Sequence, residues 1–309
     1  MGKAIYQNLH PASKIALVTL IALIGLIAFM VLSAILAVPF FGPEAFTTLL
    51  NNGLTVDESN IALLKYFQMA QSIGLFVFPA IIAALLFGTK VTSYLRLKKR
   101  PYVFSGILAI IIILSASPLI NVLGVWNAEM QLPDFLSSIE NWMKQSEESA
   151  AQLTELFVKA DNVWVLLFNI LLIGILPAIG EEFLFRGVIQ RVFTEWTKNQ
   201  HVAIWLTAIL FSALHLQFYG FVPRALLGAM FGYMFVWSGN LWLPVLAHFV
   251  NNTAAVFAYY LYGKGSISID PDSIGVGTEY QIAAIFSLVF VIVFFWFYYR
   301  YESIKRLKN

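Results

Sequence analysis

The chain has 309 residues, of which 60% are hydrophobic and only 12% are charged. A soluble globule of this composition would expose a large apolar surface, whereas several stretches reach the roughly 20 residues that a helix needs to cross a hydrocarbon core of about 30 Å. The absence of cysteine excludes disulfides, thiolate metal sites and cysteine nucleophiles, and a net charge of +2 argues against a nucleic-acid partner. We therefore expect an integral, multi-pass membrane protein embedded in the lipid bilayer.

Hydropathy predicts eight membrane-spanning helices and leaves no soluble domain between them. In chain order these spans are 14–40, 66–89, 102–124, 162–195, 201–217, 221–238, 241–262 and 280–300. The predicted fold class is all-α, a polytopic transmembrane helical bundle, with residues 1–309 in a single integral membrane domain. The first span is too long for a signal-peptide core, so we expect it to remain as an anchor.

The distribution of basic residues predicts the orientation of the bundle, because cytoplasmic connections are rich in Lys and Arg. Alternate connections, together with both termini, hold 14 of the 19 basic residues, and the opposite connections hold most of the acidic ones. An even number of spans with both termini in the cytoplasm follows. The predicted location is a bacterial plasma membrane.

The long outer connection 125–161 has apolar residues at helical spacing, which predicts an amphipathic helix lying near the membrane interface as a cap. These residues are Leu132, Phe135, Leu136, Ile139 and Met143.

Five other residues are interpreted as structural. Gly228 and Gly232 form a Gly-x-x-x-Gly in the sixth span, a spacing that lets helix backbones approach closely. His10 and His201 lie near predicted interfaces, where an imidazole costs little free energy. Arg224 lies near an outer end of its span, and we expect its side chain to extend to the interface.

Two adjacent carboxylates, Glu181 and Glu182, lie inside the apolar fourth span. An acidic residue at a helix centre costs about 2.5–3.5 kcal/mol on insertion scales, so the pair requires a compensating partner or a function. Glu182 and Arg186 stand four residues apart on one helical face, where a guanidinium can bind a carboxylate. We predict an ion pair that orients the site.

Glu181 points about 100° away from Glu182 and therefore needs a different neighbour. The polar run 197–200 predicts a turn between the fourth and fifth spans. Counted from Lys198, Glu181 lies 17 residues back and His215 lies 17 residues forward. In an antiparallel hairpin both would lie roughly 25 Å from the turn, so we predict that Glu181 and His215 meet inside the membrane.

His248 and Asn252 stand four residues apart in the seventh span and share one face. They lie roughly 12 and 18 Å from the turn predicted at 238–240, a depth that overlaps that of the hairpin. Polar groups from three helices therefore converge. Because intramembrane ionisable residues are functional candidates by default, the set predicts a catalytic site.

These residues fit two forms of peptide-bond hydrolysis. A Glu beside a His can activate water by general base catalysis, while a second His and an amide donate hydrogen bonds to a developing oxyanion. Alternatively, Glu181, His215 and His248 can hold a divalent metal such as zinc, which lowers the pKa of its bound water to about 7. The sequence leaves both forms open.

Three motifs, in this order, resemble those of the CPBP or Abi family, which includes the type II CAAX prenyl endopeptidases. They are Glu181-Glu182-x-x-x-Arg186, Phe211-x-x-x-His215 and His248-x-x-x-Asn252. The stretch 239–248 also looks like the family's approach to its last motif. The resemblance covers about residues 170–255, the predicted catalytic core, and the ordered trio is far more specific than any one motif.

The resemblance implies an intramembrane endopeptidase whose substrate is a prenylated or other membrane-associated protein or peptide. The roles that it implies are water activation by Glu181 and His215, orientation of the site by Glu182 and Arg186, and oxyanion stabilisation by His248 and Asn252.

Other classes of protein explain the sequence less well. Neither the Gly-x-Ser-Gly of rhomboid-like peptidases, nor the Gly-x-Gly-Asp of presenilin-like enzymes, nor any His-Glu-x-x-His occurs in the chain. An ion-coupled transporter would use the same ionisable residues near the midplane, but it predicts an inverted repeat, and no second half echoes 162–262. A non-catalytic bacteriocin self-immunity protein would keep the site as a relic, and the complete set of motifs argues against decay.

Overall fold

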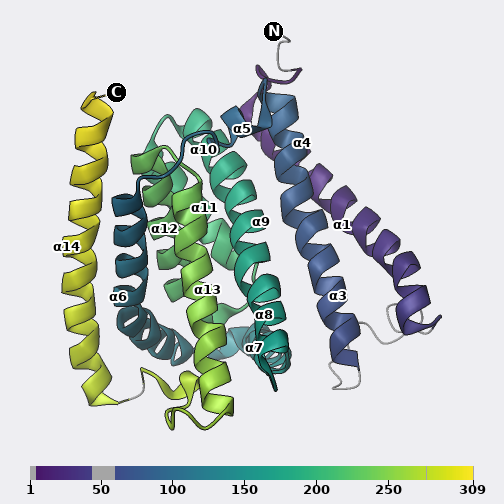
Figure 1. Cartoon of the computed structure of the whole chain (residues 1–309), viewed down its shortest axis with the longest axis vertical. Coiled ribbons are helices and arrows are strands. Elements are labelled where there is room, and N and C mark those ends of the chain that lie inside the picture. The colour runs from purple at the N-terminus through teal and green to yellow at the C-terminus, as the bar shows by residue number, and fades with distance from the viewer. Residues whose placement is uncertain (1–4, 44–59, 276, 309) are drawn as a thin grey trace.

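The computed structural model describes residues 5–43, 60–275 and 277–308, and every regular element in these ranges is helical (Figure 1). The α-helices are α1 (Pro11–Phe41), α3 (Ile61–Ser72), α4 (Phe78–Phe87), α5 (Val91–Tyr94), α6 (Val103–Ala128), α7 (Ser137–Val158), α8 (Val163–Asn169), α9 (Leu176–Leu184), α10 (Gln190–Thr197), α11 (Gln200–Ala213), α12 (Phe221–Ser238), α13 (Trp242–Gly263) and α14 (Thr278–Lys308). Three π-helical segments, Ile73–Val77, Ile170–Ile175 and Phe185–Ile189, join some of them into longer rods. The predicted all-α bundle is confirmed.

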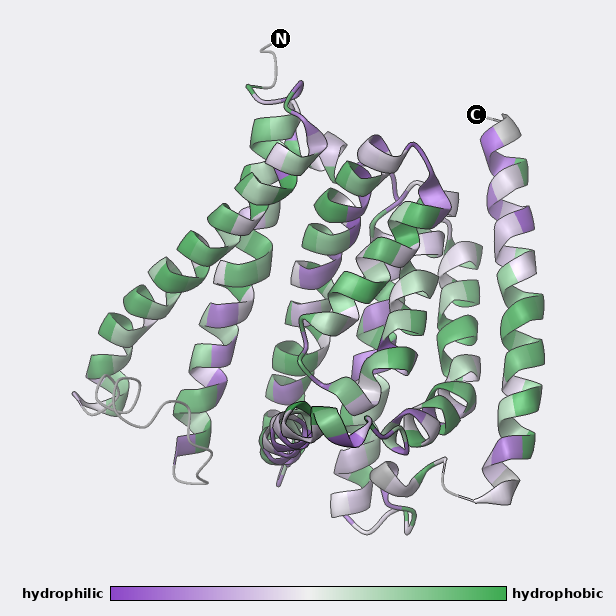
Figure 2. Ribbon diagram, turned by 180° about the vertical axis from the view of Figure 1, so that it is seen from behind, coloured by the Kyte–Doolittle hydropathy of each residue, from purple (hydrophilic) through white to green (hydrophobic). Residues whose placement is uncertain are grey.

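Six helical rods in the described ranges are long and apolar enough to cross a membrane, and they match six of the eight predicted spans. They are Pro11–Phe41, Ile61–Phe87, Val103–Ala128, Val163–Thr197, Phe218–Ser238 and Tyr280–Arg306. The two other predicted spans are α11, an apolar helix of only 14 residues, and α13, whose 22 residues include four polar side chains in the middle. Figure 2 shows hydrophobic residues along most of the length of the long helices.

Left-handed residues and polar caps make the two turns that the sequence predicts. Lys198 takes φ 55° after α10, and Asn199 caps α11 by accepting hydrogen bonds from the backbone N–H groups of His201 and Val202. Gly239, at φ 64°, ends α12 in the same way, because glycine adopts this conformation without steric cost. The hairpins α10–α11 and α12–α13 follow from these turns.

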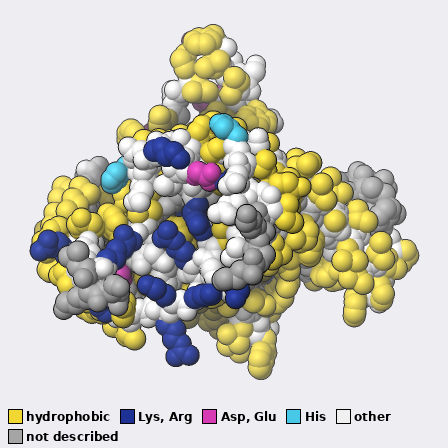
Figure 3. All heavy atoms as spheres, turned by 90° about the horizontal axis from the view of Figure 1, so that it is seen from above, with side chains coloured by type: hydrophobic (Ala, Val, Ile, Leu, Met, Phe, Trp, Pro, Cys, Tyr) yellow, Lys and Arg dark blue, Asp and Glu magenta, His cyan; other side chains and the backbone are white. Residues whose placement is uncertain are grey.

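Both ends of the described chain lie at the same end of the bundle (Figure 1), as an even number of spans requires. Seen from that end, the surface carries a ring of Lys and Arg side chains (Figure 3). Near its edge, the buried Lys14 of α1 forms an ion pair of 2.8 Å with Glu195 of α10. The arrangement agrees with the predicted placement of the basic residues on one side of the membrane.

Helix α7 runs across the opposite end of the bundle, and Figure 2 shows it nearly end on, with mainly hydrophilic residues. It begins at Ser137, so the predicted amphipathic helix starts later than its apolar pattern suggested: Leu132 lies before the helical segments and Leu136 lies in a short 3-10 turn. The C-terminal residues Phe157 and Val158 are buried against the bundle. Helix α7 is therefore a cap that is packed on the membrane helices at its C-terminal end.

A buried lysine that the sequence analysis did not single out helps to hold this cap. Lys65 of α3 donates a hydrogen bond of 2.7 Å to Asn169 Oδ1. The amide nitrogen of Asn169 in turn donates to the backbone carbonyls of Val158 and Lys159, 3.2 Å away, at the end of α7. Helices α3, α7 and α8 are joined by this network, which fixes the position of α7 beneath the bundle.

Helix α11 ends at Ala213 rather than at the predicted residue 217. The chain then turns, with Leu216 in the left-handed region at φ 54°, before the short 3-10 turn Phe218–Gly220 leads into α12. His215 therefore lies just outside the helix rather than on its face.

Gly228 and Gly232 of α12 bring its backbone close to two neighbouring helices. A Cβ on Gly228 would lie 3.2 Å from Arg186 Nη2 and 3.3 Å from Ala208, and a Cβ on Gly232 would lie 2.8 Å from Gln190 Oε1. The predicted packing role is confirmed. The spacing also exposes backbone carbonyls, which accept hydrogen bonds from Arg186 and from Gln190.

Candidate active site

The predicted ion pair between Glu182 and Arg186 is present and completely buried, with both side chains 0% exposed. Arg186 Nη1 donates to Glu182 Oε1 at 2.8 Å, as the four-residue spacing requires. The π-helical segment Phe185–Ile189 begins between the two residues and includes Arg186, and such widened turns are frequent at functional sites. Burial of both charges in an apolar bundle is costly unless their remaining atoms find partners.

Arg186 finds some of those partners on α11 and α12, whereas its Nε and the Oε2 atom of Glu182 have no hydrogen-bond partner in the described part of the chain. Its Nη2 donates to the backbone carbonyl of Gly228 at 2.8 Å, a contact that the missing Cβ of this glycine permits. The guanidinium carbon lies 4.8 Å from the ring centroid of Phe211 and 5.5 Å from that of Phe231. Cation–π attraction is strongest where the cation is desolvated, so these rings stabilise the buried charge. Arg186 therefore fixes three helices around the carboxylate of Glu182.

His248 of α13 connects the two carboxylates. Its Nδ1 lies 2.9 Å from Glu182 Oε1, and because an ionised carboxylate can only accept, Nδ1 carries the shared proton. Nε2 then faces Glu181 Oε2 at 3.8 Å, too far for a direct hydrogen bond but close enough for one water molecule to contact both atoms. The ring also stacks on Phe231, with centroids 5.1 Å apart. Its orientation is thus fixed on both sides.

The predicted meeting of Glu181 and His215 is replaced by a shared cavity. Neither a hydrogen bond nor an ion pair joins these two residues in the described part of the chain, and the imidazole that approaches Glu181 is that of His248. His215 Nδ1 instead donates to the backbone carbonyl of Phe211 at 2.7 Å. This carbonyl belongs to the last turn of α11, where helix carbonyls lack intrahelical donors, so the histidine caps its own helix.

Asn252 is held by a backbone carbonyl of the fourth span. Its Nδ2 donates to the backbone oxygen of Ile173 at 3.0 Å. Ile173 lies in the π-helical segment Ile170–Ile175, directly before α9. The Oδ1 atom of Asn252 accepts from Asn251 Nδ2 at 3.1 Å. The predicted oxyanion donor is therefore oriented by these two contacts, with one amide hydrogen left over.

A cavity of about 500 Å³ lies beside these groups, and Glu181, His215, His248 and Asn252 all line it. Glu182 and Arg186 lie behind its wall. Much of the remaining lining is apolar and comes from several helices, including the cap α7: Ile120, Leu153, Phe157, Leu172, Pro177, Leu227 and Phe231. The four predicted residues that touch a reacting group thus face one space, and the two predicted orienting residues support it.

Arg224 also lines this cavity, a contact that the sequence did not predict. Its two terminal nitrogens donate to the backbone oxygen of Gln217, at 3.2 Å, and to Gln217 Oε1, at 2.8 Å. These contacts hold the guanidinium against the turn that follows α11. A cation in the cavity wall is available to an anionic group of a ligand.

The arrangement does not form a ready metal site. In the part of the chain that the structure describes, no three His, Asp or Glu side chains are grouped so as to hold a metal ion. His215 and His248 both use Nδ1 within the protein and leave Nε2 free, as metal-binding histidines also do, but only His248 lies within 4 Å of Glu181. Zinc dependence stays a prediction.

We expect Asn252→Ala to reduce kcat/KM for peptide cleavage about 100 to 1000-fold, the magnitude typical of a lost oxyanion donor. The lost hydrogen bond to Ile173 should lower the free energy of unfolding by only about 1 kcal/mol. The measurement pairs cleavage rates with thermal unfolding in detergent. Asn251→Ala is the comparison, because Asn251 also lines the cavity but uses its amide to donate to Asn252 Oδ1, and its loss should reduce activity less. An unchanged rate for Asn252→Ala would remove Asn252 from the site.

Several residues of the site were missed or undervalued from the sequence. Phe231 and Phe211 flank Arg186. Phe211 was quoted only as part of a motif, and Phe231 was missed because aromatic residues are too frequent in this chain to single out. Gly228 was interpreted as packing only, although its spacing of 42 residues from Arg186 matches that of Gly232 from Gln190. That repeated spacing becomes meaningful only once the two helices are known to be adjacent.

Comparison with known proteins agrees with the geometry. Residues 162–254 match the model of a family described as type II CAAX prenyl endopeptidase Rce1-like. The uncharacterized protein YpbD of Bacillus subtilis (strain 168) is 34% identical over 94 residues, which cover 29% of this chain and 44% of that protein. This chain thus matches less than half of the length of that relative. No solved structure matches this chain. Because the matched segment contains all three motifs, the predicted resemblance is confirmed: residues 162–254 are similar to the Rce1-like, type II CAAX prenyl endopeptidase family.

Proposed function

We propose that this protein is an intramembrane endopeptidase that hydrolyses a peptide bond with water activated by Glu181. The observation that carries the proposal is the placement of Glu181 and His248 Nε2, 3.8 Å apart, on the wall of one cavity, above a buried ion pair. A second carboxylate is fixed behind them by Arg186, so only one of the two glutamates reaches the reacting space. The family match favours a peptidase over a carrier that would use the same residues for ion binding.

In the proposed reaction, Glu181 accepts a proton from a water molecule while the oxygen of that water attacks the scissile carbonyl carbon. The carbonyl electron pair moves onto oxygen, where His248 Nε2–H and the free amide hydrogen of Asn252 stabilise it. When the intermediate collapses, the C–N bond breaks and the proton on Glu181 passes to the leaving nitrogen. His215 orients the water, because its Nδ1–H is bound to Phe211 and its Nε2 is left as an acceptor.

The charge of the site supports these protonation states. Ionised Glu181 and Glu182 together with Arg186 carry one excess negative charge in a buried region. A second proton on the ring of His248, at Nε2 in addition to the one at Nδ1, makes the four residues neutral, and a neutral cluster avoids the cost of a net charge in the membrane. That proton is also the one that the oxyanion requires.

The cavity suggests where the substrate enters. Its wall includes Leu153, Thr154 and Phe157 of α7, at the end of the bundle opposite to both termini. With the termini in the cytoplasm, as the basic residues predict, this is the outer side of a bacterial plasma membrane. The apolar lining is suited to a lipid-modified or membrane-associated peptide, and Arg224 is placed to bind an anionic group such as its terminal carboxylate.

The test is cleavage of a farnesylated CAAX-type peptide by the purified protein in detergent, detected by mass spectrometry. The same peptide without the farnesyl group is the comparison substrate. We expect the wild type to cleave the farnesylated peptide faster, because the apolar cavity binds the lipid, and chelation to leave the rate unchanged if no metal takes part. Cleavage of both peptides at equal rates would contradict the lipid-modified substrate, and a Glu181→Ala variant as active as the wild type would contradict the peptidase site.

A further inference from the structure

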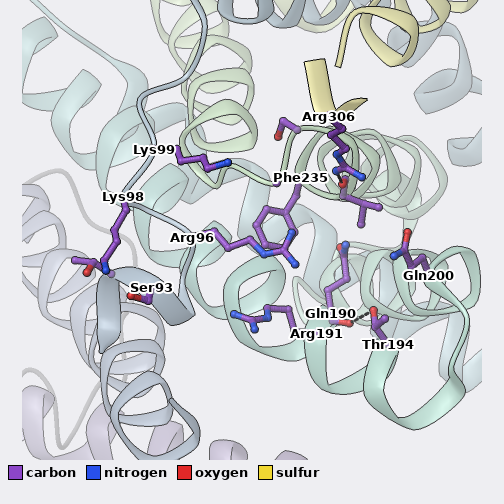
Figure 4. Close-up of a pocket in the computed structure, with 14 residues that line it drawn as sticks. Ser93, Arg96, Lys98, Lys99, Gln190, Arg191, Thr194, Gln200, Phe235 and Arg306 are labelled. Carbon is purple, nitrogen blue, oxygen red and sulfur yellow. Dashed lines mark hydrogen bonds between the residues drawn. The ribbon is translucent and has the colours of Figure 1, made fainter. Parts of the chain in front are cut away.

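A second cavity, of about 600 Å³, lies at the end of the bundle that carries both termini (Figure 1), and Figure 4 shows the side chains that line it. Five of the fourteen residues that line it are basic and none is acidic. The five are Arg96, Lys98, Lys99, Arg191 and Arg306. They come from the α5–α6 connection, from α10 and from α14, so the fold gathers charges that are distant in the sequence.

Basic residues are expected on this side of the membrane for topology alone, but topology does not require them to share a cavity. Two carboxylates at this end of the bundle are already bound elsewhere: Glu195 by Lys14 and Glu302 by the hydroxyl of Ser105. Neither lines the cavity. Glu195 also interacts electrostatically with Arg191 from outside the cavity, but two carboxylates cannot neutralise five cations, so an excess of positive charge remains at the cavity.

Arg96 occupies the middle of the site, between Phe235 and Arg191 (Figure 4). Its guanidinium carbon lies 5.4 Å from the ring centroid of Phe235. Its backbone takes φ 56°, a left-handed conformation that residues other than glycine rarely adopt and that is concentrated at ligand sites. Desolvation against the wall lowers the pKa of Arg96, and the nearby cations Arg191 and Arg306 lower it further.

The segment that carries Arg96 is fixed to the rest of the bundle by backbone contacts. Leu241 N–H donates to the carbonyl of Arg96 at 3.4 Å, Asn240 Nδ2 donates to that of Lys99 at 2.6 Å, and the indole of Trp242 donates to that of Leu97 at 3.2 Å. Repelling cations on a free loop would separate. Here the backbone is held in place, so the like charges stay together at the cavity.

We propose that this cavity binds an anion that carries phosphate, such as the phosphoglycerol group of a lipid or a free phosphorylated molecule. Guanidinium groups match phosphate oxygens with paired hydrogen bonds, and more than one is available here. Hydroxyl and amide side chains complete the lining and are suited to the glycerol or sugar hydroxyls of such a ligand: Thr92, Ser93, Gln190, Thr194, Gln200 and Ser238. The site lies where phosphorylated head groups and cytoplasmic solutes would both reach it, given the predicted orientation.

Binding is measured by isothermal titration of the full-length protein in a neutral detergent. Three probes are used: dioctanoyl phosphatidylglycerol, sn-glycerol 3-phosphate, and dioctanoyl phosphatidylcholine, which has no net charge. We expect saturable binding of at least one of the two anionic probes and none of phosphatidylcholine. Tighter binding of the lipid than of glycerol 3-phosphate assigns the site to a head group, and equal binding of the two assigns it to the soluble phosphate.

The variant Arg96→Gln/Arg306→Gln should weaken that binding at least tenfold, since each charge-assisted hydrogen bond contributes about one factor of ten or more. Lys90→Gln/Arg300→Gln removes the same charge from residues that do not line the cavity and should bind as the wild type does. Arg96→Gln alone repeats the test if the double variant does not fold. Equal losses in both double variants, or no saturable binding of either anionic probe to the wild type, would overturn the proposal, which does not depend on peptidase activity.

Discussion

The substitution Glu181→Gln is expected to reduce kcat for peptide cleavage by about three orders of magnitude, within the range of a lost general base. Glutamine keeps the shape of the side chain but cannot accept a proton from water. The nearest imidazole atom is 3.8 Å away and makes no direct hydrogen bond, so the fold should be preserved. The measurements are single-turnover rates and the thermal unfolding temperature in the same detergent.

The matched control for this variant is Glu148→Gln, which removes one carboxylate from the exposed face of α7. It should leave both the rate and the unfolding temperature unchanged. His215→Ala should reduce cleavage as Glu181→Gln does, because the water would lose its second acceptor. If Glu181→Gln cleaves at the wild-type rate while remaining folded, Glu181 is not the base and the proposed chemistry is wrong.

The sequence predicted this site well where the chemistry depends on spacing along one helix. Four residues separate Glu182 from Arg186, and this alone predicts the ion pair that the structure contains. The turns at 198 and at 239 are also local, since they follow from a polar run and a glycine, and they set the depth at which α13 meets the glutamates. Local sequence patterns therefore predict the two hairpins and much of the convergence of polar residues at the site.

The sequence failed where the outcome depends on a helix end or on an adjacent helix. His215 was expected on the face of a helix, but α11 ends at Ala213 and the ring turns back to the carbonyl of Phe211. Arg224 was expected near an outer helix end, but its hydrogen bonds to Gln217 and its place in the cavity wall were not predicted. The position of such a side chain depends on which hydrogen-bond acceptors lie nearest to it. These acceptors are known only once the packing of the helices is known.

Arg186→Met is expected to destabilise the protein by about 3–5 kcal/mol, because it leaves the completely buried carboxylate of Glu182 without its guanidinium. Methionine fills most of the same space between Phe211 and Phe231. The loss in free energy of unfolding therefore comes from the missing charge rather than from an empty cavity. The free energy of unfolding is measured in mixed detergent, and Arg300→Met, on the surface of α14, is the control that should change little. A variant as stable as the wild type would show that His248 compensates Glu182 on its own.

The double variant Glu182→Gln/Arg186→Met distinguishes the contribution of the buried pair to stability from its role in orienting the His248 ring. Because it removes both buried charges, it should regain most of the stability that Arg186→Met loses. It should not regain cleavage, since His248 Nδ1 then faces a neutral amide in place of the carboxylate that fixes its proton and its ring. A stable double variant with wild-type activity would mean that the buried pair only fills the core; a stable but inactive one would mean that the pair serves catalysis through His248.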